Sequence, residues 1–204
     1  MVKTIRNWKF LLGYLIAHLL LYFTFDHTNV FWYILTGSSF FLISYSIMNE
    51  EVDDKIPVGQ YLLYGILSGL LLYGLFWLGN AIINGLNLSY FENQVQSLYK
   101  HFSPDLIWHY IVLVLVIIPA EEFFWRGFIQ KRFLANTNFW TSILASAILY
   151  ASVYIFSGYP ILIVAALISG IVWGILYAWK RSLPLVVMSH LTFDLMIFLF
   201  LPLI

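Results

Sequence analysis

The chain has 204 residues, of which 62% are apolar and only 10% are charged, and its formal net charge is zero. In a soluble domain about a quarter of the residues are charged, so this composition excludes a water-soluble globular domain. Without an excess of positive charge nothing attracts nucleic acid, and the absence of cysteine excludes disulfides and thiolate chemistry.

The apolar residues are gathered in long runs, which predict an all-α, polytopic membrane helix bundle. Lipid tolerates only helices or closed barrels, and a spanning helix needs about 20 apolar residues. We predict about seven transmembrane helices around a polar intramembrane cavity, in one integral-membrane domain over 1–204. The predicted segments are Trp8–Phe25, Asn29–Met48, Val58–Ile83, Leu106–Phe133, Phe139–Phe156, Ile161–Trp179 and Leu183–Leu203.

Two features mark these segments in chain order. Small residues four positions apart, Gly65 with Gly69 in the third segment and Gly170 with Gly174 in the sixth, indicate close contacts between helices. The stretch Asn84–Ser103 is the most polar in the chain. We expect it to form an external loop with a helix at the membrane interface.

The basic residues predict the orientation of the helices. If the chain crosses the membrane at every segment, eight Lys and Arg residues fall on one side and Lys100 alone falls on the other. Since basic loops stay cytoplasmic, we predict a cytoplasmic N-terminus and an external C-terminus. The eight residues are Lys3, Arg6, Lys9, Lys55, Lys131, Arg132, Lys180 and Arg181.

The fourth segment carries ionisable residues that are costly in lipid, and such residues are functional candidates by default. Glu122 and Arg126 are four positions apart, so they share a helix face and can pair. Glu121 projects about 100° away and stays free to act as a general base. The alternative is a structural Glu–Arg clamp without chemistry. Pro119, two positions before Glu121, predicts a bend.

A second cluster lies in the last segment, where His190 and Asp194 are also four positions apart. Asp194 can orient the imidazole or hold it protonated, and the alternative is a polar pair that joins helices. Glu121 and His190 both lie about 14–15 Å from the basic flank, at about 1.5 Å per residue. Because their depths match, we predict that the two clusters share one pocket.

The two ordered motifs, Glu-Glu-x-x-x-Arg followed by His-x-x-x-Asp, resemble those of the CAAX prenyl protease and bacteriocin-processing (CPBP, Abi) intramembrane endopeptidases. The similar stretch is about Ile111–Leu195, within a catalytic core of about 106–203. The resemblance implies a helical core whose cavity opens toward the cytoplasmic side, in a bacterial plasma membrane. It implies hydrolysis of a peptide bond in a membrane-associated peptide or protein, with membrane lipid as the other partner.

The resemblance also implies roles for the motif residues. Glu121 would activate water, while His190 and Asp194 would orient or stabilise the developing oxyanion. Glu122 and Arg126 would organise the site.

The sequence departs from this family at its middle motif, Phe-x-x-x-His. The aligned stretch here runs from Tyr150 to Tyr154, so Tyr154 stands at the histidine position. A phenol is a poor base, although it can support the site by hydrogen bonding. If zinc is the cofactor, its obvious ligands are Glu121, Glu122 and His190.

Two other functions follow from these observations. The loss of the middle histidine favours a pseudoprotease, a membrane binding or scaffold protein with a role such as bacteriocin immunity. The intramembrane acids and histidine are also compatible with a proton-coupled transporter, although the chain lacks the internal repeat common in transporters.

Overall fold

The computed structural model describes residues 7–204 and is built from helices. Among these residues the β contact is an isolated bridge between Asp54 and Ser182. The α-helices in the first half are α2 (Trp8–Asp26), α3 (Phe31–Asn49), α4 (Val58–Gly85) and α5 (Ser89–Phe102). Those in the second half are α6 (Ile107–Val112), α7 (Ile118–Glu122), α8 (Lys131–Asn136), α9 (Phe139–Ser152), α10 (Pro160–Lys180) and α11 (Leu183–Leu195). Short 3-10 or π-helical segments extend several of them: η1 (Thr28–Val30), η2 (Leu113–Ile117), η3 (Phe123–Gln130), η4 (Val153–Ser157) and η5 (Met196–Phe200).

Seven helical runs among the described residues are long and apolar enough to cross a membrane. Their outward side chains are large and apolar, for example Leu71 and Ile107, because a lipid-facing surface needs no polar cover. The prediction of an all-α polytopic membrane bundle is confirmed. The runs are Trp8–Asp26, Thr28–Asn49, Val58–Gly85, Ile107–Asn136, Phe139–Ser157, Pro160–Lys180 and Leu183–Phe200.

The fourth run, Ile107–Asn136, is continuous and contains two π-helical segments, η2 and η3. Pro119 lies at the start of α7 between them. Proline cannot donate a backbone hydrogen bond to the preceding turn, and π-helical turns re-route such bonds at functional sites. The run therefore continues past the proline instead of ending there.

The predicted glycine contacts are confirmed. A Cβ atom on Gly69 would lie 2.5 Å from the backbone oxygen of Ser189, so α4 and α11 touch through their backbones. In the same way, a Cβ on Gly170 would lie 3.3 Å from Cα of Ala147 in α9. These approaches fix the two helix pairs α4–α11 and α9–α10, which include α9, α10 and α11, the helices that surround α7 at the site.

The end of the bundle that carries the basic loops is closed by ion pairs. Asp53, in the loop between α3 and α4, lies 3.1 Å from Nζ of Lys131 and 3.0 Å from Nη2 of Arg181. Tyr177 donates a hydrogen bond of 2.7 Å to the same carboxylate. The loop is thereby tied to α8 and to the turn between α10 and α11. We call this the basic end.

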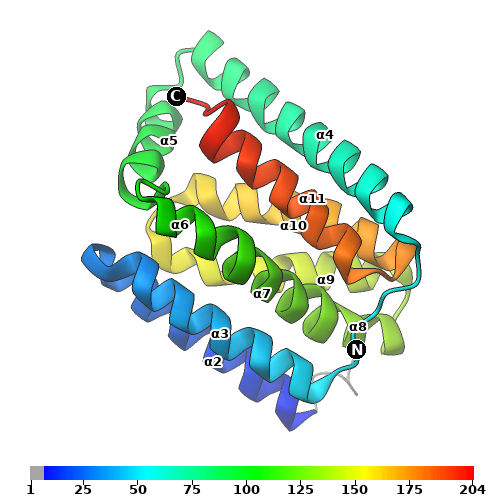
Figure 1. The fold of residues 1–204 in the computed structure, drawn as a ribbon. Helices are drawn as coiled ribbons and strands as arrows, with labels where there is room; N and C mark the ends of the chain where they lie inside the picture. Colours follow the sequence, from blue (N-terminus) through cyan, green and yellow to red (C-terminus); the bar gives the residue numbers. More distant parts are fainter. Residues whose placement is uncertain (1–6) are drawn as a thin grey trace.

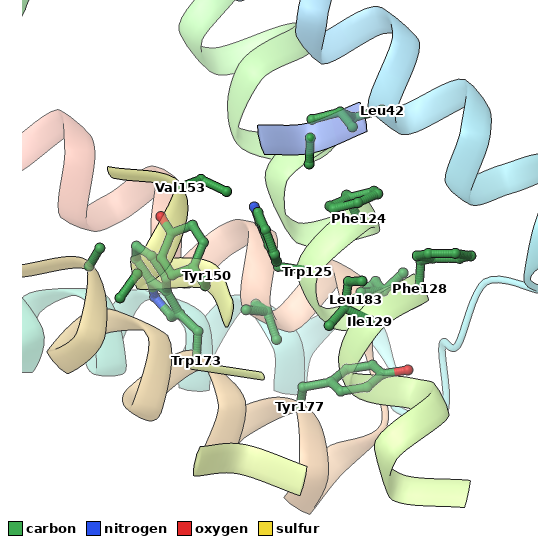
Figure 2. Close-up of a cluster of buried hydrophobic side chains, with 14 of the residues drawn as sticks. Leu42, Phe124, Trp125, Phe128, Ile129, Tyr150, Val153, Trp173, Tyr177 and Leu183 are labelled. Carbon is green, nitrogen blue, oxygen red and sulfur yellow. The ribbon is translucent and has the colours of Figure 1, made fainter. Parts of the chain in front are cut away.

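The half of the bundle next to the basic end is densely packed. Figure 2 shows a cluster of buried side chains from α3, η3, α9, η4, α10 and the start of α11, of which those from η3, α10 and α11 fill this half. The core residues Phe124, Phe128, Ile129, Tyr177 and Leu183 are at most 1% exposed. The helix α5 lies at the opposite end of the bundle from α8 (Figure 1), and we call this opposite end the α5 end.

Candidate active site

Glu122, Arg126 and His190 form a buried ionic group in the middle of the bundle. Nη1 of Arg126 donates to Oε1 of Glu122 at 3.0 Å, and Nδ1 of His190 lies 2.7 Å from the same oxygen. Glu122 is 0% exposed, so its charge depends on these partners, because an unpaired buried charge is very costly. The predicted pairing of Glu122 with Arg126 is confirmed. His190, from the last span, joins this pair through the same oxygen of Glu122.

Aromatic rings hold Arg126 and His190 in place. The Arg126 guanidinium lies 4.8 Å from the ring centroid of Tyr150 and 5.2 Å from that of Trp173, and it donates to the Gly170 carbonyl at 3.4 Å. The imidazole of His190 stacks on Trp173 with ring centroids 3.8 Å apart. Trp173 therefore lies against both side chains and fixes their positions.

Glu121 projects to another side and is held by two phenols. Tyr150 donates to Oε2 at 2.9 Å and Tyr154 donates to Oε1 at 3.2 Å. The two hydroxyls are themselves 3.1 Å apart. The sequence predicted that Glu121 stays apart from Arg126, and the structure adds that the residue at the family's histidine position and its neighbour one helical turn earlier each bind one oxygen.

Asp194 lies beside the second nitrogen of His190. Oδ2 of Asp194 is 3.6 Å from Nε2, which is within ion-pair range and too long for a hydrogen bond. Since Nδ1 is occupied by Glu122, Nε2 is the nitrogen available to a bound molecule. Glu122 and Asp194 therefore flank the two nitrogen atoms of the imidazole.

These groups meet at one cavity of about 500 Å³. Glu122 and Arg126 do not line it, so they support the site from behind. Most of the lining is apolar. The polar site residues lie near the middle of the membrane-spanning helical runs. The site residues that line the cavity are Glu121, Tyr150, Tyr154, Trp173, His190 and Asp194.

The cavity lies in the half of the bundle toward the α5 end. Its lining includes the last turns of α2 and α4, the first turns of α3 and α10, and one face of α5. Dense packing and the Asp53 ion pairs close the basic end. The resemblance implied a cavity open toward the cytoplasmic, basic side, and the structure instead directs it away from the basic loops.

The predicted zinc ligands are not arranged as a metal site. Among residues 7–204, no three His, Asp or Glu side chains are grouped so that they could hold a metal ion. Oε1 of Glu122 is shared by Arg126 and His190, and Glu121 is bound by two phenols. The side chains present therefore do not fit the ligand set Glu121, Glu122 and His190.

Two residues of the site were not predicted from the sequence. Tyr150 lies four positions before Tyr154 and so on the same helix face, and this spacing is the signal that could have identified it. Trp173 carries no such signal, because aromatic residues make up 20% of the chain.

Comparison with known proteins supports the resemblance that the motifs predicted. Residues 103–196 match the family model described as type II CAAX prenyl endopeptidase Rce1-like. The matched stretch contains both motifs and every residue predicted for the site. No curated protein and no solved structure matches the chain. The matched family is one of CAAX prenyl endopeptidases, and the match covers slightly less than half of the chain.

Proposed function

We propose that the protein is an intramembrane endopeptidase that hydrolyses a peptide bond in a membrane-associated peptide or protein. The observation that carries this proposal is the meeting of Glu121, His190 and Asp194, from two distant spans, at one cavity. Glu122, which is adjacent in sequence to Glu121, is withdrawn from the cavity by Arg126. Adjacent carboxylates thus have separate environments, as acid–base catalysis requires.

The chemistry would begin with water placed between Glu121 and His190. Glu121 takes a proton from the water while the water oxygen attacks the carbonyl carbon of the scissile bond. The Nε2–H group of His190 donates to the oxyanion that forms. Glu121 then returns the proton to the amide nitrogen, the carbon–nitrogen bond breaks, and a carboxylic acid and an amine are released.

The phenols of Tyr150 and Tyr154 have a positioning role in this scheme. Each donates to one oxygen of Glu121 and fixes the plane of the carboxylate. Since the carboxylate has two lone pairs on each oxygen, it can still accept a hydrogen bond from water.

The proposal is tested with Glu121→Gln and His190→Gln in folded protein reconstituted in nanodiscs. Cleavage of an internally quenched apolar peptide should fall about 100-fold or more in each variant, as expected for a lost acid–base or oxyanion group. Glu51→Gln and His27→Gln alter exposed side chains and serve as matched controls. Undiminished cleavage in both site variants would remove the mechanism.

A second candidate is a pseudoprotease that binds a membrane peptide without cleaving it. The observation that favours it is that phenols of Tyr150 and Tyr154 bind both oxygens of Glu121, while the family's histidine is absent from position 154. The test is to measure peptide binding and to search for cleavage products by mass spectrometry in the same sample. Binding without products supports this candidate, and products from unaltered protein exclude it.

We further propose a bacterial plasma membrane as the location, with the basic end cytoplasmic and the α5 end external. The distribution of Lys and Arg supports this orientation. Substrate would then reach the cavity from the external half of the membrane.

A further inference from the structure

The rim of the cavity at the α5 end holds a short piece of the chain's own backbone. After η5, residues 201–204 leave the helix. The backbone N–H of Leu203 donates to the hydroxyl of Tyr99 at 3.0 Å. Nδ2 of Asn80 donates to the backbone carbonyl of Leu203 at 2.7 Å. Both peptide groups of one residue are therefore bound by side chains from α4 and α5.

Further contacts hold the flanking residues. Tyr73 donates to the carbonyl of Leu201 at 2.8 Å, and Tyr99 donates to the carbonyl of Ile197 at 2.8 Å. Burial raises the pKa of Tyr99 to about 12, so its hydroxyl stays protonated and can donate and accept at once. The bonds reach backbone atoms, and so they do not depend on which side chains the bound segment carries.

Leu203 also contributes to the cavity itself. Leu203, Asn80 and Tyr99 all line it, together with Glu121 and His190 deeper inside. No Lys or Arg is among the described residues that line the cavity. An uncharged, apolar segment with free backbone groups is the ligand that this chemistry accepts, because apolar walls with a few polar groups orient a bound chain.

We propose that Asn80 and Tyr99 form a backbone-binding subsite for an extended apolar peptide segment, and that Leu203 fills this subsite as an intramolecular competitor. The inference rests on the proposed function in so far as the peptide is its substrate. The nearby side chains of Leu201 and Ile204 reach the surface, since they are 54% and 72% exposed.

The test uses a single introduced thiol, which is clean because the chain has no cysteine. Leu203→Cys is combined with Glu121→Gln to prevent turnover, and the full chain is placed in nanodiscs. The rate of reaction with a water-soluble maleimide is measured with and without the probe acetyl-Leu-Pro-Leu-Ile-amide. The peptide should displace the segment and raise the labelling rate about tenfold, which corresponds to the loss of one or two hydrogen bonds.

Two controls show whether backbone binding is responsible. The same peptide methylated on the nitrogen of its third residue cannot donate to Tyr99 and should leave the labelling rate unchanged. Ile204→Cys, at an exposed position, should react at one rate with and without peptide. Equal labelling of Leu203→Cys with and without the probe, or equal displacement by the methylated peptide, would overturn the proposal.

A kinetic measurement distinguishes failure of the subsite proposal from failure of the endopeptidase proposal. In otherwise unaltered protein, Leu203→Pro removes the backbone N–H that donates to Tyr99 and should lower KM for an apolar peptide about fivefold with kcat unchanged, because competition is weakened. The labelling result needs no cleavage. Displacement without any cleavage upholds the subsite and removes the endopeptidase, whereas cleavage without displacement upholds the endopeptidase and removes the subsite.

Discussion

The hydroxyl of Tyr154 lies 3.2 Å from Oε1 of Glu121, at the position where the similar family has a histidine. A histidine there could accept a proton from water, which the phenol does poorly at neutral pH. If Glu121 can act as a base while Tyr154 donates to it, the protein is an endopeptidase. If it cannot, the protein is a pseudoprotease.

We expect Tyr154→His to raise kcat/KM for an apolar peptide about 10- to 100-fold, because a second base is added beside Glu121. The measurement is the initial rate of cleavage in nanodiscs as a function of peptide concentration. Tyr154→Phe, which removes the hydroxyl and adds no base, is the matched control and should show no such gain. An equal gain in both variants would mean that release of Glu121, and not the new base, is responsible.

Arg126→Met should destabilise the protein by about 3–5 kcal/mol, because it leaves Glu122 with less compensation for its buried charge. The free energy of unfolding in detergent is the measurement. Adding Glu122→Gln to the same chain removes the stranded charge and should recover part of the loss. If single and double variants are equally unstable, the pair does not act as a unit.

Gly69→Ala should cost about 1–3 kcal/mol of unfolding free energy, because the new Cβ would lie 2.5 Å from the Ser189 carbonyl. Gly74→Ala is the matched control on the same helix, since no atom lies within 4 Å of its Cβ position. It should be neutral or stabilising by up to about 1 kcal/mol. Similar effects of both changes on thermal stability would argue against the close α4–α11 contact.

The Asp53 ion pairs predict a loss of stability in acid. Partial burial raises the pKa of Asp53, but hydrogen bonds from Tyr177 and Lys131 and the charges of Arg181 and Lys131 outweigh it, so the pKa lies below the usual 3.8. A lowered pKa contributes stability that is complete above the unfolded value and is lost as pH falls through the folded value.

The loss from Asp53 is therefore expected below about pH 4. The measurement is the melting temperature between pH 3 and pH 7 at constant ionic strength. Asp53→Asn should be less stable at pH 7 and should lose less stability on acidification. A melting temperature of the Asn variant that runs parallel to that of the unaltered protein would contradict the assignment.

The sequence was sufficient for the spans and for the pairing within each motif. The Glu122–Arg126 contact follows from spacing on one helix, and the convergence of Glu121 with His190 follows from matching depth and the cost of charge in lipid. The contact between Glu122 and His190 joins different spans, and helical periodicity does not specify it.

The contact between Glu121 and Tyr150 was not predicted, because aromatic side chains are common throughout this chain and the spacing from Tyr154 was the only signal that marked Tyr150. The direction of the cavity could not be predicted. The direction of the cavity depends on which half of the bundle is filled. That is settled by the packing of side chains such as Phe128 and Leu183 from separate helices.

The dense core beneath Glu122 closes the cavity toward the basic end. If the protein is the proposed endopeptidase, a polypeptide that enters from the α5 end could not thread through to the basic loops, so neither fragment would be released on that side of the bundle.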